Sequence, residues 1–334
     1  MRHGVKWLLF LGFIIGSIFI AVNHLAAYDL WMASRTKLDD ETLRSIERTK
    51  LSDESIFLAR ATQASFAGAT EFNAACRESN DSGQGGYTTL GCYIAPYGRV
   101  YVYRIDDKRV EGIDDAVLVH EILHVAWARL GKGEQDRLSK ILTDTYNQIS
   151  SPKLADRMKK YDKTEPGQRA NELHSILPTE IKDLPAELEE YYSRYFDDRQ
   201  IVVGLFSKYS KPFDDIETKL SNIKTKIEKT EKFIKTENRE LEQLVDDFQS
   251  DSVALSNRRN SINRYNHNTV SQYNTQIDLL NTRASDLNRR IAKLKKAYQE
   301  YTQDIKSYNQ AGVTLNSLNA SIDSTTLSSV RELK

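Results

Sequence analysis

Hydrophobic residues recur at alternating intervals of four and three along two stretches in the last third of the chain. The first stretch runs from Ile216 to Leu255, and the second runs from Val270 to Tyr308. Heptads sustained over more than five repeats predict coiled-coil helices. The register slips by one residue within the asparagine-rich segment 257–268, where asparagine disfavours a continuous helix. We therefore expect a long antiparallel coiled-coil hairpin over 211–311. One unbroken helix paired between subunits is the alternative.

An apolar run without acidic or basic residues separates Lys6 from Asp29 near the amino terminus. About 20 such residues can span a bilayer as a helix, and Arg2 and Lys6 before the run favour a cytoplasmic amino terminus. We therefore expect residues 1–28 to form a cytoplasmic stub and a transmembrane anchor. This predicts a single-pass protein of the cell membrane with its catalytic domain outside the cytoplasm. A cleaved signal peptide is the alternative, and it leads to the same compartment.

The middle of the chain is predicted to combine helices with a small sheet. Residues 32–66 are expected to be mostly helical. Alternating apolar residues predict strands over 89–94 and 99–105, and the Ala-Pro-Tyr-Gly turn between them should join the strands as a hairpin.

A His-Glu-x-x-His motif, His120 to His124, lies in an otherwise uncharged and mostly apolar stretch. The stretch predicts a buried helix that begins near Asp114 and ends at the glycines of 131–133. Residues four apart share one face of a helix, so both imidazoles can reach one zinc ion. Glu121 can then act as general base on a zinc-bound water. The alternative is a core helix with two satisfied histidines, in which a buried charge on Glu121 would be costly.

A second motif, Asn171-Glu172, follows in a short helical segment that begins after Pro166-Gly167 and that Pro178 should stop. The order of the two motifs resembles that of the gluzincin metallopeptidases, of which thermolysin is the familiar member. The resemblance covers roughly residues 115–180. It implies a Zn²⁺ cofactor held by His120, His124 and Glu172.

The same resemblance implies a small zincin-like domain over 29–210, in which an edge strand holds an extended peptide; 99–105 is our candidate for that strand. The family places an aspartate four residues after the glutamate ligand to orient a zinc histidine, but this chain has Ile176 there. Another group must therefore supply that contact.

Several other residues are candidates for roles in such a site. His174 is the rival third ligand, but it points about 200° away from Glu172 around the same helix. Zincins usually add a donor for the oxyanion that forms during hydrolysis. Tyr192, Tyr195 and Arg199 share a helical stripe and could supply that donor, although core packing is the more common use of such a stripe.

Two cysteines, Cys76 and Cys92, flank a glycine- and serine-rich loop. We expect a disulfide between them, closing a loop of about 17 residues and contributing on the order of 3 kcal/mol. The alternative is a pair of unrelated buried thiols. The absence of Cys-x-x-Cys spacing gives no indication of redox catalysis or of a thiolate zinc site.

The 334 residues carry 28% charged side chains, with 47 basic and 47 acidic residues. The chain is too long for one small domain and too polar for a multi-span membrane protein. We therefore predict an α+β fold with an N-terminal transmembrane helix, a zincin-like domain, a coiled-coil hairpin and a tail over 312–334.

The predicted function is a membrane-anchored zinc metallopeptidase that hydrolyses peptide bonds. The coiled coil is a candidate surface for a protein partner, and no nucleic-acid partner is expected. The alternative is a non-catalytic envelope scaffold whose coiled coil recruits a partner and whose metal site is structural.

Overall fold

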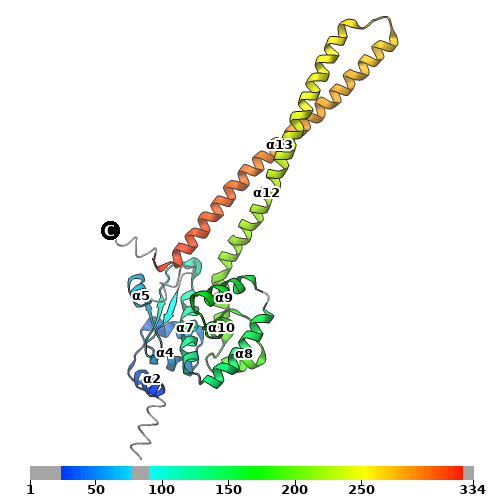
Figure 1. Cartoon of the computed structure of the whole chain (residues 1–334). Coiled ribbons are helices and arrows are strands. Elements are labelled where there is room, and N and C mark those ends of the chain that lie inside the picture. Colours follow the sequence, from blue (N-terminus) through cyan, green and yellow to red (C-terminus); the bar gives the residue numbers. More distant parts are fainter. Residues whose placement is uncertain (1–23, 77–89, 150, 326–334) are drawn as a thin grey trace, which may run out of the picture. The chain divides into compact units, whose positions relative to one another are not determined.

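The computed structural model describes residues 24–76, 90–149 and 151–325 (Figure 1). The chain divides into two compact units, one made of residues 1–213 with 317–334, and the other of residues 214–316. The described elements of the first unit are the helices α2 (His24–Arg35), α3 (Asp40–Thr49), α4 (Asp53–Ala61), α5 (Ala69–Ala75), α7 (Ile113–Arg129), α8 (Lys132–Gln148), α9 (Pro152–Thr164), α10 (Arg169–Glu180) and α11 (Ala186–Tyr192), with the strands β1 (Ser65–Ala67), β2 (Gly91–Tyr93) and β3 (Val100–Tyr103).

The described residues are mostly helical, so the predicted α+β fold is wrong. The sheet has three strands of only three or four residues each. Side-chain caps fix the starts of three of these helices. The side chains of Asp39 and Ser52 accept hydrogen bonds from the first turns of α3 and α4, and Ser151 does the same for α9 with Pro152 at its first position.

The predicted transmembrane helix and cell-membrane location also need correction. Within residues 24–76, 90–149 and 151–325, no helix is both long enough and apolar enough to cross a membrane. The first described helix, α2, has 12 residues and buries the charged Asp29. The apolar run on which the prediction rested falls in residues 1–23, outside the described residues. The structure thus gives no support for a single-pass membrane protein.

The sheet has the strand order β1-β3-β2, with β1 parallel and β2 antiparallel to β3. The segment 99–105 was expected to be an edge strand, but β3 is the central strand. The reason is that Ser65–Ala67, expected at the end of a helical region, pairs with Tyr101–Tyr103. The edge strand that contacts α7 is therefore β2.

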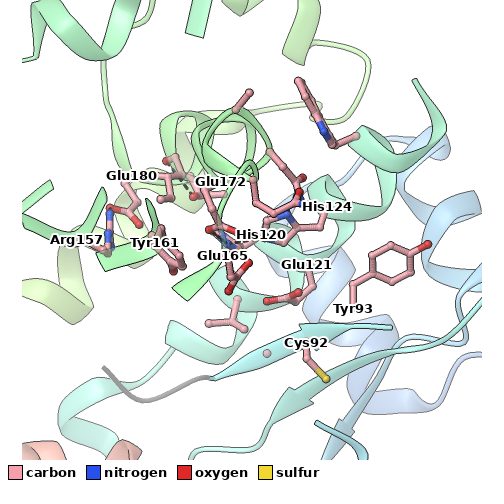
Figure 2. Close-up of a pocket in the computed structure, with 18 of the residues that line it drawn as sticks. Cys92, Tyr93, His120, Glu121, His124, Arg157, Tyr161, Glu165, Glu172 and Glu180 are labelled. Atoms are coloured by element: carbon pink, nitrogen blue, oxygen red, sulfur yellow. Dashed lines mark hydrogen bonds and ion pairs between the residues drawn. The ribbon is translucent and has the colours of Figure 1, made fainter. Parts of the chain in front are cut away.

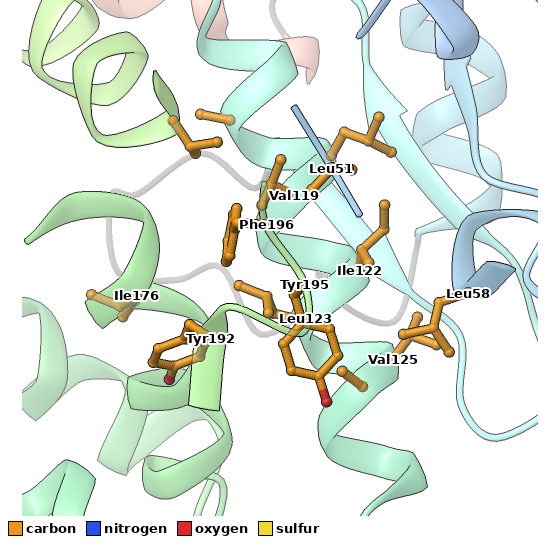
Figure 3. Packing of buried hydrophobic residues seen from close by; sticks show 14 of the residues in the cluster. Leu51, Leu58, Val119, Ile122, Leu123, Val125, Ile176, Tyr192, Tyr195 and Phe196 are labelled. Atoms are coloured by element: carbon orange, nitrogen blue, oxygen red, sulfur yellow. The ribbon is translucent and has the colours of Figure 1, made fainter. Parts of the chain in front are cut away.

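Helix α7 runs through the core and is apolar on nearly all sides. Its contacts include α3, α4, α10 and the strands β2 and β3. Figure 3 shows Val119, Ile122, Leu123 and Val125 of this helix among the surrounding apolar side chains; each is at most 1% exposed. A helix that is apolar on nearly all sides is buried in the core of a protein. The packing around α7 therefore holds its polar side chains in fixed positions.

The second unit consists of most of two long helices, α12 (Arg199–Arg258) and α13 (His267–Ile322). Its arms are antiparallel, because partners in α13 come earlier in the chain as the position in α12 moves forward. Arg290 bonds Glu237 and Glu240 at 2.6 and 2.7 Å, and Lys226 bonds Asp304 at 3.0 Å. Helix α12 ends within the asparagine-rich segment. The side chain of Asn266 accepts hydrogen bonds at the start of α13.

The chain returns to the first unit after the hairpin. Arg109 donates a hydrogen bond to the Ser317 hydroxyl at 3.2 Å. Asn73 and Ser324 exchange two hydrogen bonds of 2.8 and 3.0 Å. Leu318 and Ile322 are both buried. The end of α13 is therefore held in the first unit by specific polar contacts as well as by packing.

Candidate metal centre

Helices α7 and α10 bring His120, His124 and Glu172 together. The two Nε2 atoms lie 3.1 Å apart, as expected for residues one helical turn apart. Glu172 approaches from α10, with Oε1 3.5 Å from His124 Nε2 and Oε2 4.0 Å from His120 Nε2. One ligand atom from each residue lies within 4.8 Å of the others, so the three side chains could hold one metal ion.

Asn171 orients one of the two histidines. The Oδ1 atom of Asn171 lies 2.9 Å from His124 Nδ1, which donates to it, so Nε2 is directed toward Glu172. The Asn171 amide in turn donates to the side chain of Gln168 at 3.3 Å. Ile176, which replaces the expected aspartate, is 1% exposed and packs in the core. The orienting contact therefore comes from the residue beside the glutamate ligand.

The surroundings shift the pKa values of the two imidazoles in opposite directions. Burial and the neighbouring His124 lower the pKa of His120 well below its ordinary value. Burial also lowers the pKa of His124, but the carboxylates of Glu172 and Glu121 and the bond to Asn171 outweigh it, so that pKa is raised. A metal ion binds the neutral form of an imidazole, so metal binding at these histidines should be coupled to proton release.

Glu121 lies next to the two histidines and is 7% exposed. Burial is the main reason why the pKa of Glu121 rises to about 7; His124 opposes the rise, and Glu172 and Glu165 add to it. Strand β2 passes very close to this side chain. A Cβ atom at Gly91 would lie 2.7 Å from Glu121 Oε1 and 2.6 Å from Val117. The glycine therefore allows the edge strand to approach the carboxylate.

These groups line a pocket of about 890 Å³, a size typical of ligand-binding sites (Figure 2). One wall is β2, and α7 and α10 carry the candidate ligands. Helix α9 forms another wall with Arg157 and Tyr161, and the Glu165 turn that follows α9 also faces the pocket. The α9 wall was missed by sequence reasoning, because nothing in its local pattern distinguishes it from a solvated helix.

The other predicted candidates lie in the core. His174 is fully buried, with Nε2 2.8 Å from the Tyr191 hydroxyl, and burial lowers its pKa to about 3. Tyr192 donates to the backbone oxygen of His174 at 2.9 Å, and Tyr195 is 2% exposed. Arg199 binds the backbone oxygens at the end of α10 and the carboxylate of Glu189. None of these four lines the pocket.

Helix α10 continues beyond Pro178 to Glu180, where we expected it to stop. Pro178 has no N–H for the carbonyl of His174, and the Tyr192 hydroxyl bonds that carbonyl instead. Arg199 binds the carbonyls at the end of the helix. Its guanidinium donates to the carbonyls of Pro178, Ile181 and Lys182 at 2.7–3.0 Å. These bonds satisfy backbone acceptors at the end of the helix.

The predicted disulfide between Cys76 and Cys92 is present. Both cysteines are buried, at 2% and 5% exposure, in a small apolar cluster with Phe72 and Tyr103. Cys92 is the middle residue of β2 and follows Gly91 directly. The crosslink therefore fastens the strand that lies against Glu121.

The donor set fits a zinc ion. Oε2 of Glu172 is buried and has no hydrogen-bond partner among the residues that the structure describes. An orphaned carboxylate oxygen of this kind is costly unless a cation satisfies it. Two imidazoles and one carboxylate are a known set for catalytic zinc. Comparison with protein families, curated proteins and solved structures finds no match for this chain.

Proposed function

We propose that this protein is a zinc-dependent metallopeptidase of the gluzincin type, with His120, His124 and Glu172 as ligands. The observation that supports this most strongly is the convergence of these three donors beside Glu121 at the wall of one pocket. When bound, zinc polarises the substrate carbonyl and lowers the pKa of a water molecule, which makes that water a nucleophile near neutral pH.

The residues of the chain would then serve three tasks. Glu121, with its pKa raised to about 7, is suited to take a proton from the attacking water and to pass it to the leaving amine. The edge strand β2 would hold an extended peptide by backbone pairing. Tyr161 is the best candidate for the oxyanion donor, because burial, together with Glu172, raises its pKa and keeps its hydroxyl protonated.

The second candidate function is a non-catalytic scaffold with a structural metal site. A structural zinc site usually has four protein ligands and no open position. Within the described residues the cluster offers three ligands beside a pocket, which favours catalysis.

The Glu121→Gln variant tests the proposal. Glutamine has nearly the same size but cannot accept the proton, so peptide cleavage should fall at least about 100-fold with zinc content close to normal. Glu172→Ala should instead lower the zinc content itself. The measurements are metal analysis and cleavage of a fluorogenic peptide library by the purified protein. Full activity in Glu121→Gln would rule out this mechanism, and a zinc-loaded but inactive wild type would favour the scaffold.

A further inference from the structure

A tight turn between α9 and α10 holds Glu165 in a fixed position. The backbone N–H of Gln168 donates to the Glu165 carbonyl at 3.1 Å, and Gly167 has a φ of +87°. Proline second and glycine third define a type II turn, in which the glycine position requires positive φ. The N–H of Glu165 also donates to Tyr161 at 2.7 Å. The turn therefore presents Glu165 from a rigid backbone.

The side chain of Glu165 faces the metal centre. It lines the same pocket as His120, Glu121 and Glu172, and Figure 2 shows it beside His120 and Glu121. Its negative charge raises the pKa of Glu121, of His124 and of Glu172. Glu165 is thus close enough to affect three groups of the proposed catalytic site without being one of its ligands.

Glu165 has no assigned task in the pocket. In the described ranges it forms no ion pair with a basic residue, although several basic side chains lie along the same pocket. Arg157 is bonded to Glu180 at 2.5 Å, and Lys132 to Asp136 at 2.6 Å. Glu172 is directed toward the histidines, and Glu121 serves the proton transfer. Glu165 is therefore the pocket carboxylate that can pair with a cation of a bound ligand.

We propose that Glu165 binds a positively charged group of the peptide substrate beside the bond that is cleaved. This inference rests on the proposed peptidase function and adds a substrate class to it. The cation is either the ammonium group at the peptide's amino terminus or the side chain of a lysine or arginine. Both would place a positive charge against Glu165 in a pocket partly shielded from water, where such a pair contributes strongly to recognition.

The test compares peptides that differ only in charge. One series carries lysine, glutamine or glutamate at a single position, and each peptide is made with a free and with an acetylated amino terminus. Wild-type protein should cleave the cationic members best, and Glu165→Gln should lower kcat/KM for them at least about tenfold while changing the neutral peptides little. Glu165→Lys should reverse the preference. Glu190→Gln, which removes an exposed carboxylate outside the pocket, should leave the preference unchanged.

A binding measurement separates recognition from chemistry. In the Glu121→Gln background, the dissociation constant of the preferred cationic peptide should rise about tenfold when Glu165→Gln is added, with zinc content unchanged. If acetylation of the amino terminus abolishes the preference, the terminal ammonium is the group that Glu165 binds. If acetylated peptides are still preferred when they carry lysine, the lysine side chain is that group.

The outcomes distinguish the two hypotheses. Cleavage without charge preference, or a preference that survives Glu165→Gln in both assays, overturns the role of Glu165 and leaves the peptidase proposal standing. A zinc-loaded wild type that cleaves no peptide of either series overturns the proposed function and, with it, the substrate class.

Discussion

At the scale of single residues, Asn171 connects the two motifs of the candidate metal centre. It accepts a hydrogen bond from His124 at 2.9 Å and lies next to the ligand Glu172. Residues that orient a metal ligand typically contribute 10–100-fold to metal affinity. We therefore expect Asn171→Ala to weaken zinc binding by about that factor, as measured by competition with a chelator. Asn171→Asp keeps an acceptor oxygen and should retain most of the affinity; equal loss in both variants would contradict the orienting role.

Asp114 provides a test of stability that is independent of the metal. Burial raises its pKa to about 6, and the adjacent Asp115 adds to this effect. The folded protein therefore binds this proton more tightly than the unfolded chain does. The contribution of Asp114 to stability is lost as the pH rises from about 4 to about 6.

In the Asp114→Asn variant the side chain stays neutral at every pH, so the variant does not lose this stability as the pH rises. Because Asp114 is partly exposed, we expect a gain of about 1 kcal/mol at pH 7.5 and almost none near pH 4. Urea unfolding of both proteins at the two pH values measures the difference. A gain of the same size at both pH values would show that the charge is not responsible.

The pairing of His120 with His124 could be predicted from the sequence because its geometry is local, whereas Glu172 was assigned through the family resemblance. His120 and His124 are four residues apart on one helix, so their shared face follows from helix geometry alone. The pocket contribution of Glu165 could not be predicted, since it depends on how α9 packs against α10. The same holds for Tyr192 and Arg199. They were expected on one helical stripe, but they lie at the end of α11 and the start of α12, and tertiary packing buries both.

At the scale of elements, β2 lies against α7 at Gly91, beside Glu121. A methyl group at Gly91 would lie 2.6–2.7 Å from the side chains of Val117 and Glu121, so these side chains or the strand must shift. We expect Gly91→Ala to lower kcat at least about tenfold with little loss of zinc, because misplacing a catalytic group is costly. Gly133→Ala, where the added carbon meets open space, is the control. Normal activity of Gly91→Ala would show that this approach is not needed.

The errors in the predicted fold also arise at this scale. Ser65–Ala67 is too short to show an alternating pattern and becomes a strand only because β3 is available as a partner. This pairing makes β3 central and leaves β2 as the edge. Helix α10 likewise passes Pro178, and the Tyr192 hydroxyl, from another helix, bonds the His174 carbonyl that the proline leaves without a donor. Long-range partners of this kind leave no signal in the local sequence.

At the scale of the whole molecule, the metal centre and the long helices belong to different units. The ligands, Glu121 and the whole pocket lie in the unit made of 1–213 and 317–334. We therefore expect that replacing residues 214–316 by a short glycine–serine linker preserves zinc content and cleavage of short peptides within about twofold. Circular dichroism and metal analysis verify folding. Loss of zinc despite a folded remainder would show that the hairpin supports the centre.

The return of α13 to the first unit has a consequence for how this architecture can vary. Residues 214–316 are an insertion whose two ends are both fixed, at Phe213 and at Ser317. Any change in one arm must be matched in the other, or the antiparallel ion pairs such as Arg290–Glu237 lose their register. One heptad in each arm alters the reach by roughly 10 Å, at about 1.5 Å per residue. The length of the hairpin can thus change in steps of one heptad, and no residue of the pocket needs to change with it.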